Sequence, residues 1–306
     1  MGIFNWKRLG IVSGLSLALF AAGCGADEEE ADNGSTTTDE GTEEAATIEG
    51  QEIELAYVEW DTEIASTHVV GKVLEDLGYD VKLTPLDNAI MWEAVANGEA
   101  DGMVAAWLPG THAAQYDAYG DQVVDLGENL EGATIGLVVP EYMDVDSIAD
   151  LDEQADQTIT GIEPGAGVVA AAEQTLEDYE NLEDWTVQTS SSGAMATALG
   201  EAFENEEEII VTGWSPHWKF QAYDLKYLED PEGTFGEAEI IATMVREGLE
   251  EDMPQAYQVL DNFHWTSEDL EAVMLDIYEG TDAEDAAAAW VEENADLVAE
   301  WTEGIE

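Results

Sequence analysis

Strand-length apolar runs alternate with segments of helical period from residue 51 to about residue 246, and this alternation constrains the fold more than any other feature. Helical patterns join the successive strands, and such units form parallel sheets with helices on both faces. The first series predicts strands at 53–58, 81–86, 102–107 and 134–139, with helices at 61–77 and 89–96. The second predicts strands at 158–162, 185–188 and 208–212, with helices at 165–179 and 192–203.

A final strand pattern at 240–245 is followed by helical patterns alone, at 254–262, 267–278 and 283–301. Each series contains a strand that runs into Trp, Pro and His, as WLPGTH at 107–112 and WSPH at 214–217. We therefore predict two similar α/β lobes facing each other across a ligand cleft. Lobe 1 comprises 51–140 plus about 240–306, and lobe 2 comprises 141–239.

The first 24 residues contain no acidic side chain. Lys7 and Arg8 precede an apolar run that is too short for a membrane span, which needs roughly 20 residues, but suits a secretory signal. The run ends in FAAGC, and Cys24 is the only cysteine. This resembles the lipobox of bacterial lipoproteins, so we predict a signal peptide at 1–23 and a lipidated Cys24. An ordinary signal peptide followed by an unpaired thiol is the alternative.

Residues 24–50 form the next segment, in which 10 side chains are acidic and almost none is large and apolar. A chain of this composition buries too little apolar surface to fold. We predict an acidic, disordered tether between the anchor and the folded lobes.

The chain has a formal net charge of −64, and without Lys7 and Arg8 it keeps five basic residues against 71 acidic ones. That sign excludes nucleic acid and anionic lipid surfaces as partners. Repulsion on this scale destabilises a compact state in dilute buffer, and salt screens it. We infer a halophilic or haloalkaliphilic source rather than chance acidic drift.

Three tryptophans stand at the ends of predicted strands: Trp60, Trp107 and Trp214. In parallel α/β sheets, ligands bind beyond the carboxyl ends of the strands. A single Trp is more often part of the core, yet three indole faces around one point form a box for a quaternary ammonium ion by cation–π attraction. The first two come from one predicted lobe and the third from the other.

Backbone N–H groups at Ile162 and at Gly165–Gly167 open a predicted helix, and a helix N-terminus favours an anion. A lone GxG turn is by itself only a helix start. His112 can add a side-chain donor. Together with the box, these donors describe a zwitterion that carries a methylated ammonium and a carboxylate. We expect no metal and no cofactor.

Four segments, AYVEWDTEIAST (56–67), AAWLPGTH (105–112), GIEPGAG (161–167) and VTGWSPHW (211–218), resemble motifs of glycine betaine-binding proteins of ABC importers, the OpuAC type. The resemblance covers nearly all of 51–306 and implies a type II periplasmic-binding fold. It implies that Trp60, Trp107 and Trp214 form the box, that the amides of Gly161 and Ile162 bind the carboxylate, and that His112 assists. Some family members place the GIEPGAG half first, which suggests a circular permutation.

The resemblance further implies capture of glycine betaine, and also proline betaine, for an ABC permease and its ATPase subunits. It implies a monomer anchored through Cys24 on the outer face of the cell membrane. A receptor for choline or carnitine is the alternative, and a carboxylate clamp argues against choline. A glycosidase is disfavoured because no acid stands out by context. The four histidines lack metal-binding spacing, so a metalloenzyme is disfavoured too.

Overall fold

A computed structural model describes residues 48–305, which form part of one compact unit. The predicted signal peptide, Cys24 and all but the last three residues of the predicted tether lie outside the described residues. Within the described part of the chain, mixed α/β structure follows the predicted order of strands and helices closely.

The first predicted strand and helix correspond to β1 (Glu52–Tyr57) and α1 (Asp61–Leu77). Helix α1 buries Ala65, Val69, Val73 and other residues of its apolar stripe. It ends at Gly78, whose φ of 106° belongs to the left-handed region that glycine adopts without strain. Strand β2 (Asp80–Pro85) then pairs parallel with β1, as the helical crossover requires.

Helix α2 (Asn88–Ala96), strand β3 (Gly102–Leu108) and helix α3 (Ala113–Tyr119) complete the first series. Strand β3 is buried along its whole length and pairs with β1 on one side. On the other side it pairs antiparallel with β9 (Glu239–Arg246), which returns to it from far along the chain.

Nine strands of the described chain form one sheet. Eight of them follow the order β2-β1-β3-β9-β4-β7-β5-β6, and β8 lies off this path, paired to β4. The prediction of purely parallel sheets was wrong at the centre of this path. Strand β4 (Val123–Pro140) is 18 residues long and antiparallel to both β9 and β7. Only part of it, 134–139, was predicted, because residues 123–133 are acidic and glycine-containing rather than continuously apolar.

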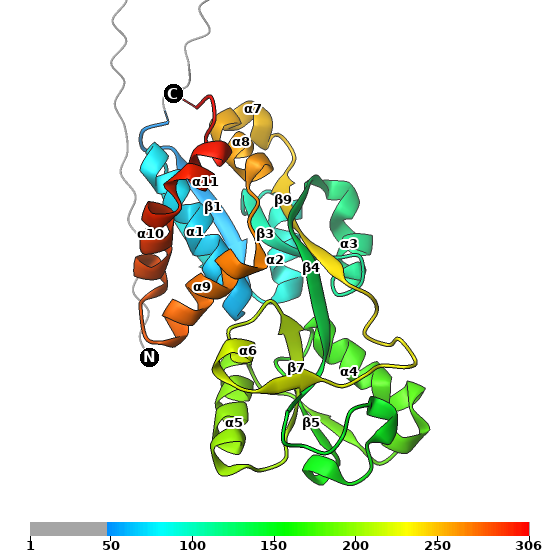
Figure 1. Cartoon of the computed structure of the whole chain (residues 1–306). Helices are drawn as coiled ribbons and strands as arrows, with labels where there is room; N and C mark the ends of the chain where they lie inside the picture. The colour runs from blue at the N-terminus through cyan, green and yellow to red at the C-terminus, as the bar shows by residue number, and fades with distance from the viewer. Residues whose placement is uncertain (1–47, 306) are drawn as a thin grey trace, which may run out of the picture. The chain divides into compact units, whose positions relative to one another are not determined.

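Strand β4 serves two groups of strands, which we name lobe 1 and lobe 2. Its residues 123–133 pair with β9 beside β1, β2 and β3 of lobe 1, and its residues 134–140 pair with β7 and β8 of lobe 2. Figure 1 shows β4 running from the upper group of elements into the lower one. The boundaries expected near residues 140 and 240 stay a prediction, because β4 belongs to both ladders.

Lobe 2 contains β5 (Thr158–Thr160), β6 (Thr186–Gln188) and β7 (Ile210–Ser215), which pair in parallel. Helices α4 (Gly167–Asp178) and α5 (Ser192–Asn205) connect them. Short elements that the sequence pattern did not predict follow, namely α6 (Lys219–Ala222) and β8 (Leu225–Tyr227). Helix α6 has only four residues and strand β8 only three, so both are too short to produce a periodic pattern in the sequence.

The last elements are helices that return to lobe 1: α7 (Leu249–Asp252), α8 (Pro254–Asn262), α9 (Ser267–Tyr278), α10 (Ala283–Glu293) and α11 (Ala295–Trp301). Helices α9 and α10 pack against α1. A single helix was predicted for 283–301, and it is interrupted at Asn294, whose side chain donates to the Trp290 carbonyl. Side-chain bonding of this kind competes with the helical backbone pattern.

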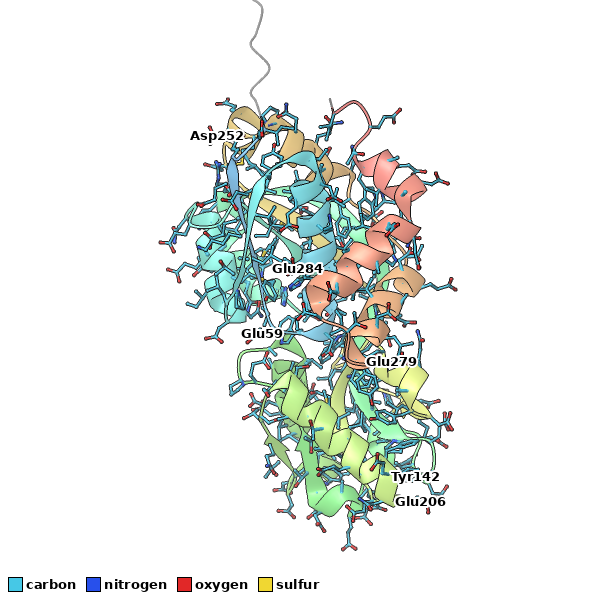
Figure 2. The ribbon with its side chains drawn as sticks, turned by 90° about the vertical axis from the view of Figure 1, so that its left-hand side faces the viewer. Glu59, Tyr142, Glu206, Asp252, Glu279 and Glu284 are labelled. Atoms are coloured by element: carbon cyan, nitrogen blue, oxygen red, sulfur yellow. The ribbon has the colours of Figure 1, made fainter. Side chains whose placement is uncertain are left out.

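Acidic side chains lie exposed over both lobes, among them Glu59, Glu206, Asp252, Glu279 and Glu284 (Figure 2). Four of the five basic residues in the described region, Lys72, Lys82, Lys226 and Arg246, contact carboxylates. The fifth, Lys219, is buried. Between residues 48 and 305, no helix has both the length and the apolar character that crossing a membrane demands.

Candidate functional site: an aromatic pocket between the lobes

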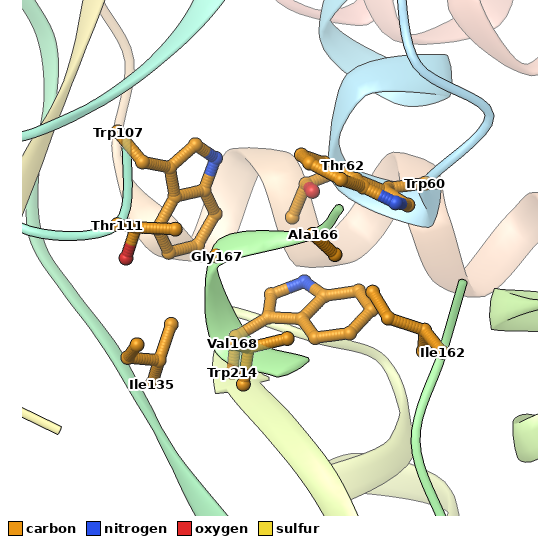
Figure 3. Close-up of a pocket in the computed structure, with 10 residues that line it drawn as sticks. All are labelled: Trp60, Thr62, Trp107, Thr111, Ile135, Ile162, Ala166, Gly167, Val168 and Trp214. Atoms are coloured by element: carbon orange, nitrogen blue, oxygen red, sulfur yellow. The ribbon is translucent and has the colours of Figure 1, made fainter. Parts of the chain in front are cut away.

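A pocket lies where residues of the two lobes meet, and its space, counting the mouth, is about 280 Å³. Figure 3 shows the rings of Trp60, Trp107 and Trp214 facing this space from different sides. The other lining residues are small, hydroxylated or aliphatic: Thr62, Thr111, Ile135, Ile162, Ala166, Gly167 and Val168. None of the lining residues in the described chain is charged, so the walls are aromatic and neutral.

The three box tryptophans come from separate elements. Trp60 immediately precedes α1, whereas Trp107 and Trp214 are the penultimate residues of β3 and β7. The sequence pattern ended the two predicted strands at residues 107 and 212, whereas both strands of the structure continue one residue past their Trp. All three rings are at most 6% exposed. Pairing of the strand ends therefore holds Trp107 and Trp214 more firmly than loops would.

A buried carboxylate fixes the ring of Trp107. Its indole Nε1 donates to Glu63 Oε1 at 2.7 Å, and the Thr62 hydroxyl donates to the other carboxylate oxygen. Both Glu63 and Thr62 are 1% exposed. Burial raises the pKa of Glu63 to about 7, and the two hydrogen bonds oppose that rise only in part. The carboxyl group therefore titrates near neutral pH just behind the box.

A second carboxylate holds Trp60, and this one belongs to the other lobe. The indole Nε1 of Trp60 donates to Glu163 Oε1, in the loop between β5 and α4. Glu163 is partly exposed, unlike Glu63. The orientation of Trp60 therefore depends on the lobes being in contact.

Trp214 has no such acceptor: its Nε1 is buried without a hydrogen-bond partner among the described residues. Its ring instead packs against His217, with centroids 4.8 Å apart, and the Lys219 Nζ lies 4.2 Å from its centroid. Burial lowers the pKa of Lys219 to about 7, against the attraction of Asp61, which raises it. Aromatic contacts and an ammonium group therefore surround Trp214 from within its own lobe.

The loop after β5 supplies the predicted anion-binding end. Ile162 lines the pocket, as do Ala166 and Gly167 at the start of α4. The amide of Gly161, however, donates to the Gln188 carbonyl at 2.8 Å. Gly161 thus has another partner in this structure, and Ile162 and the start of α4 are the groups that face the pocket.

Gly167 shows why glycine is needed at this contact. A Cβ atom built on it would lie 2.1 Å from the Thr111 carbonyl oxygen, closer than any real contact. Thr111 is in lobe 1 and is itself held by Glu239 of β9, which accepts from its backbone N–H at 2.8 Å. The two lobes therefore approach backbone to backbone beside the pocket.

His112 lies behind the lining rather than in it. It is buried, and its Nδ1 accepts from the Trp107 backbone N–H at 3.2 Å. That bond leaves the hydrogen on Nε2, which is buried and has no partner in the described chain. Burial lowers the pKa of His112 to about 3, so the ring is neutral. Its centroid lies 5.8 Å from that of Trp60, so the free donor is close to the box.

Sequence reasoning missed Glu63, Lys219 and Trp218. A signal for Glu63 was available, because it lies one helical turn from Thr67 and two from Val70 on the buried face of α1. A carboxylate on that face needs a buried partner. Lys219 had a compositional signal, since few basic residues remain in the chain. Nothing in the sequence separated Trp218 from an ordinary core residue.

The chain is similar to known proteins in sequence and in fold. The family model described as the substrate binding domain of ABC-type glycine betaine transport system matches residues 51–293. The glycine betaine/carnitine transport binding protein GbuC of Listeria monocytogenes is 51% identical over 175 residues. That match spans 57% of this chain and 57% of the Listeria protein.

Two solved structures are similar over most of the described chain. Lactococcal OpuAC, in its closed-liganded conformation with glycine betaine, is 55% identical with a TM-score of 0.81, covering 83% of this chain and 100% of that one. The glycine betaine/L-proline-binding protein ProX from Borrelia burgdorferi is 33% identical with a TM-score of 0.80, covering 83% and 97%. By its matched residues and its fold, the chain belongs to the family of substrate-binding domains of ABC-type glycine betaine transport systems.

Proposed function

We propose that this chain captures glycine betaine, and also proline betaine, outside the cytoplasm and passes it to the permease and ATPase subunits of an ABC importer. It acts by binding and release, without chemical conversion of the ligand. Family membership and the similarity to betaine-bound OpuAC support the ligand class.

The observation that carries this proposal is the neutral, aromatic lining of the pocket. A quaternary ammonium ion has no N–H to donate, so it needs no carboxylate and gains from indole faces. A primary ammonium would lose hydrogen bonds to water that these walls cannot replace. Trp60, Trp107 and Trp214 therefore select for methylation.

The carboxylate of the ligand is proposed to face the opposite end of the pocket. Ile162 and the N-terminus of the 12-residue helix α4 supply backbone donors there. The Nε2–H of His112, which has no hydrogen-bond partner within residues 48–305, is the proposed side-chain donor. Gly161 is proposed to position this loop through its bond to Gln188 rather than to touch the ligand.

Titration calorimetry with glycine, dimethylglycine, glycine betaine, proline betaine, choline and carnitine tests the proposal. Affinity should rise with each added methyl group and should be low for choline, which lacks the carboxylate. His112→Ala should weaken carboxylated ligands while leaving their methyl preference unchanged. Equal affinity for glycine and glycine betaine would refute the aromatic box, and preferential binding of choline or carnitine would identify the alternative receptor.

Membrane attachment is proposed to depend on Cys24, which lies outside the described residues. A lipid on this thiol plus an acylated amino terminus would anchor the chain stably, because more than one acyl chain suffices. Cys24→Ser should release the protein from membranes or leave it unprocessed. A processed Cys24→Ser variant that still sediments with membranes would contradict the lipid anchor.

A further inference from the structure

Trp218 is not among the residues that line the pocket, and within the described chain it forms no hydrogen bond to any of them. Its side chain is nevertheless buried, at 3% exposed. It lies in lobe 2, directly before α6. Within lobe 2 its ring lies near His217 and Tyr223, with centroids 5.3 and 6.1 Å away, and two further contacts come from lobe 1. Its indole Nε1 donates to Asp61 Oδ1 at 2.7 Å, and its ring stacks on Tyr278 with centroids 3.7 Å apart and planes at 13°.

Asp61 is the first residue of α1 and follows the box residue Trp60. Besides the Trp218 indole, it accepts from the hydroxyl of Ser192, at the start of α5, at 3.1 Å. The buried His217 imidazole is 3.5 Å from the same carboxylate, too far for a well-formed hydrogen bond. One lobe 1 carboxylate thus binds two separate elements of lobe 2.

Tyr278 ends α9, and this helix makes further contacts with lobe 2. The Tyr278 hydroxyl is 3.0 Å from that of Tyr223, and Gln221 donates to Glu271 at 2.8 Å. Figure 1 shows α9 of lobe 1 beside α6 of lobe 2. Tyr278 is 45% exposed, so its ring covers Trp218 rather than filling the core.

We propose that Trp218, Asp61 and Tyr278 form a closure latch: a set of contacts between the lobes that holds the pocket shut over its ligand without touching the ligand. These three residues are positioning residues. Separating the lobes would break the indole–carboxylate bond and the aromatic stack together, and would place all three groups in water.

The charges around Asp61 favour this arrangement. Burial opposes its ionisation, yet His217, the Trp218 indole and the Lys219 ammonium together hold the pKa of Asp61 below its usual value. Lys219 is the one buried basic residue of the described chain, and its charge is attracted to Asp61. Closure therefore brings a lobe 1 carboxylate near the buried Lys219 of lobe 2.

The latch rests on the proposed function, and its consequence is a slower release of ligand. Only the closed form carries the latch, and apparent affinity scales with the population of the binding-competent form. Asp61→Ala should weaken glycine betaine by roughly 10- to 100-fold, because it removes a charged hydrogen bond to a buried indole. Tyr278→Ala should weaken it by roughly 2- to 10-fold through loss of the stack.

Stopped-flow fluorescence and calorimetry in molar salt would measure these effects on the full mature chain. The loss should lie in a faster dissociation rate, and the ligand-free melting temperature should stay close to that of the wild type. Tyr278→Phe keeps the ring and loses only the hydroxyl contact with Tyr223, so it should bind more tightly than Tyr278→Ala does. Glu59→Ala removes a nearby exposed carboxylate that makes no bond to lobe 2 among the described residues, and it should leave the dissociation rate unchanged.

A double variant, Asp61→Ala with Tyr278→Ala, should lose less affinity than the two single losses multiplied, because both act through Trp218. Wild-type affinity and dissociation rate in both single variants would overturn the latch while leaving the proposed function intact. An equal effect of Glu59→Ala would also overturn it, in favour of general charge attraction. A wild-type protein that fails to bind glycine betaine would overturn the function and the latch together.

Discussion

The two lobes supply indole rings to the same pocket but hold them in different ways. In lobe 1, Trp107 and Trp60 each donate their Nε1–H to a carboxylate, Glu63 and Glu163. In lobe 2, the Nε1–H of Trp214 has no acceptor among the described residues, and the ring lies between His217 and Lys219.

This difference separates two requirements of an aromatic box. Each ring must offer a π face, and each must hold its orientation while the site is empty. A hydrogen bond to a fixed acceptor sets orientation directly, as for Trp107 with the buried Glu63. Packing and strand pairing set it for Trp214, which lies within β7. Substitutions that remove the face, the N–H or the acceptor should therefore act differently on the two lobes.

Removal of a whole ring should have the largest effect. A desolvated cation–π contact contributes about 2 kcal/mol or more, so Trp60→Ala, Trp107→Ala and Trp214→Ala should each weaken glycine betaine by roughly 10- to 100-fold. Calorimetry measures the change. Tyr142→Ala, in which an exposed ring outside the pocket is lost, is the control and should bind normally. If any one of the three variants bound glycine betaine normally, the Trp replaced in it would not be part of the box.

Phenylalanine keeps a π face and removes only the N–H, so it sharpens the comparison between the lobes. Trp107→Phe leaves the buried Glu63 without its indole donor and should cost roughly 10-fold in affinity, because buried acceptors are costly to leave unpaired. Trp214→Phe removes an N–H that has no acceptor in the part of the chain that the structure describes, and it should cost clearly less. Equal losses in the two variants would show that the N–H bond to Glu63 does not set the geometry of Trp107.

The pH dependence of stability tests whether Glu63 differs from an ordinary carboxylate. Burial raises its folded-state pKa from 4.5 to about 7, so its contribution favours the folded state at low pH and is lost as the pH rises through about 7. Between pH 5 and pH 8 the wild type should therefore lose stability relative to Glu63→Gln, by on the order of 1 kcal/mol.

Thermal unfolding of both proteins in molar salt at several pH values gives this difference. Glu63→Gln keeps an oxygen acceptor for the Trp107 indole, so the comparison isolates the charge. A stability difference that is constant from pH 5 to pH 8 would mean that Glu63 is ionised throughout, and would contradict the effect of burial on the pKa of this carboxyl group.

The smallest effect is expected at Glu163, which is partly exposed and holds Trp60 from across the pocket. A hydrogen bond to a partly exposed acceptor contributes little net free energy, about 0.5–1.5 kcal/mol, so Glu163→Ala should weaken glycine betaine by only a few-fold. Glu163→Gln keeps the acceptor and should bind as the wild type does. A loss at Glu163→Ala as large as that at Trp60→Ala would place Glu163 in direct contact with the ligand's environment.

The sequence could single out the three tryptophans that line the pocket, because a strand end and a Trp coincide at each of them. Strand patterns have short, recognisable ends, and a Trp at such an end is uncommon enough to single out. The predicted strand ends were one residue short at Trp107 and three residues short at Trp214, because β3 ends at Leu108 and β7 ends at Ser215. It also assigned the Gly161 amide to the ligand, whereas the structure pairs that amide with Gln188, 27 residues away in β6. Backbone pairing over that distance leaves no trace in a local pattern.

The sequence by itself determined the order of elements, the α/β class and the three indoles, because period, turn residues and strand ends are properties of neighbouring residues. Only the tertiary structure decided that β4 runs antiparallel through both lobes, that Glu63 lies behind Trp107, and that Trp218 lies between Asp61 and Tyr278. Those contacts join residues 44 to 157 positions apart. Their chemistry depends on burial, which arises only when the lobes and their helices pack together.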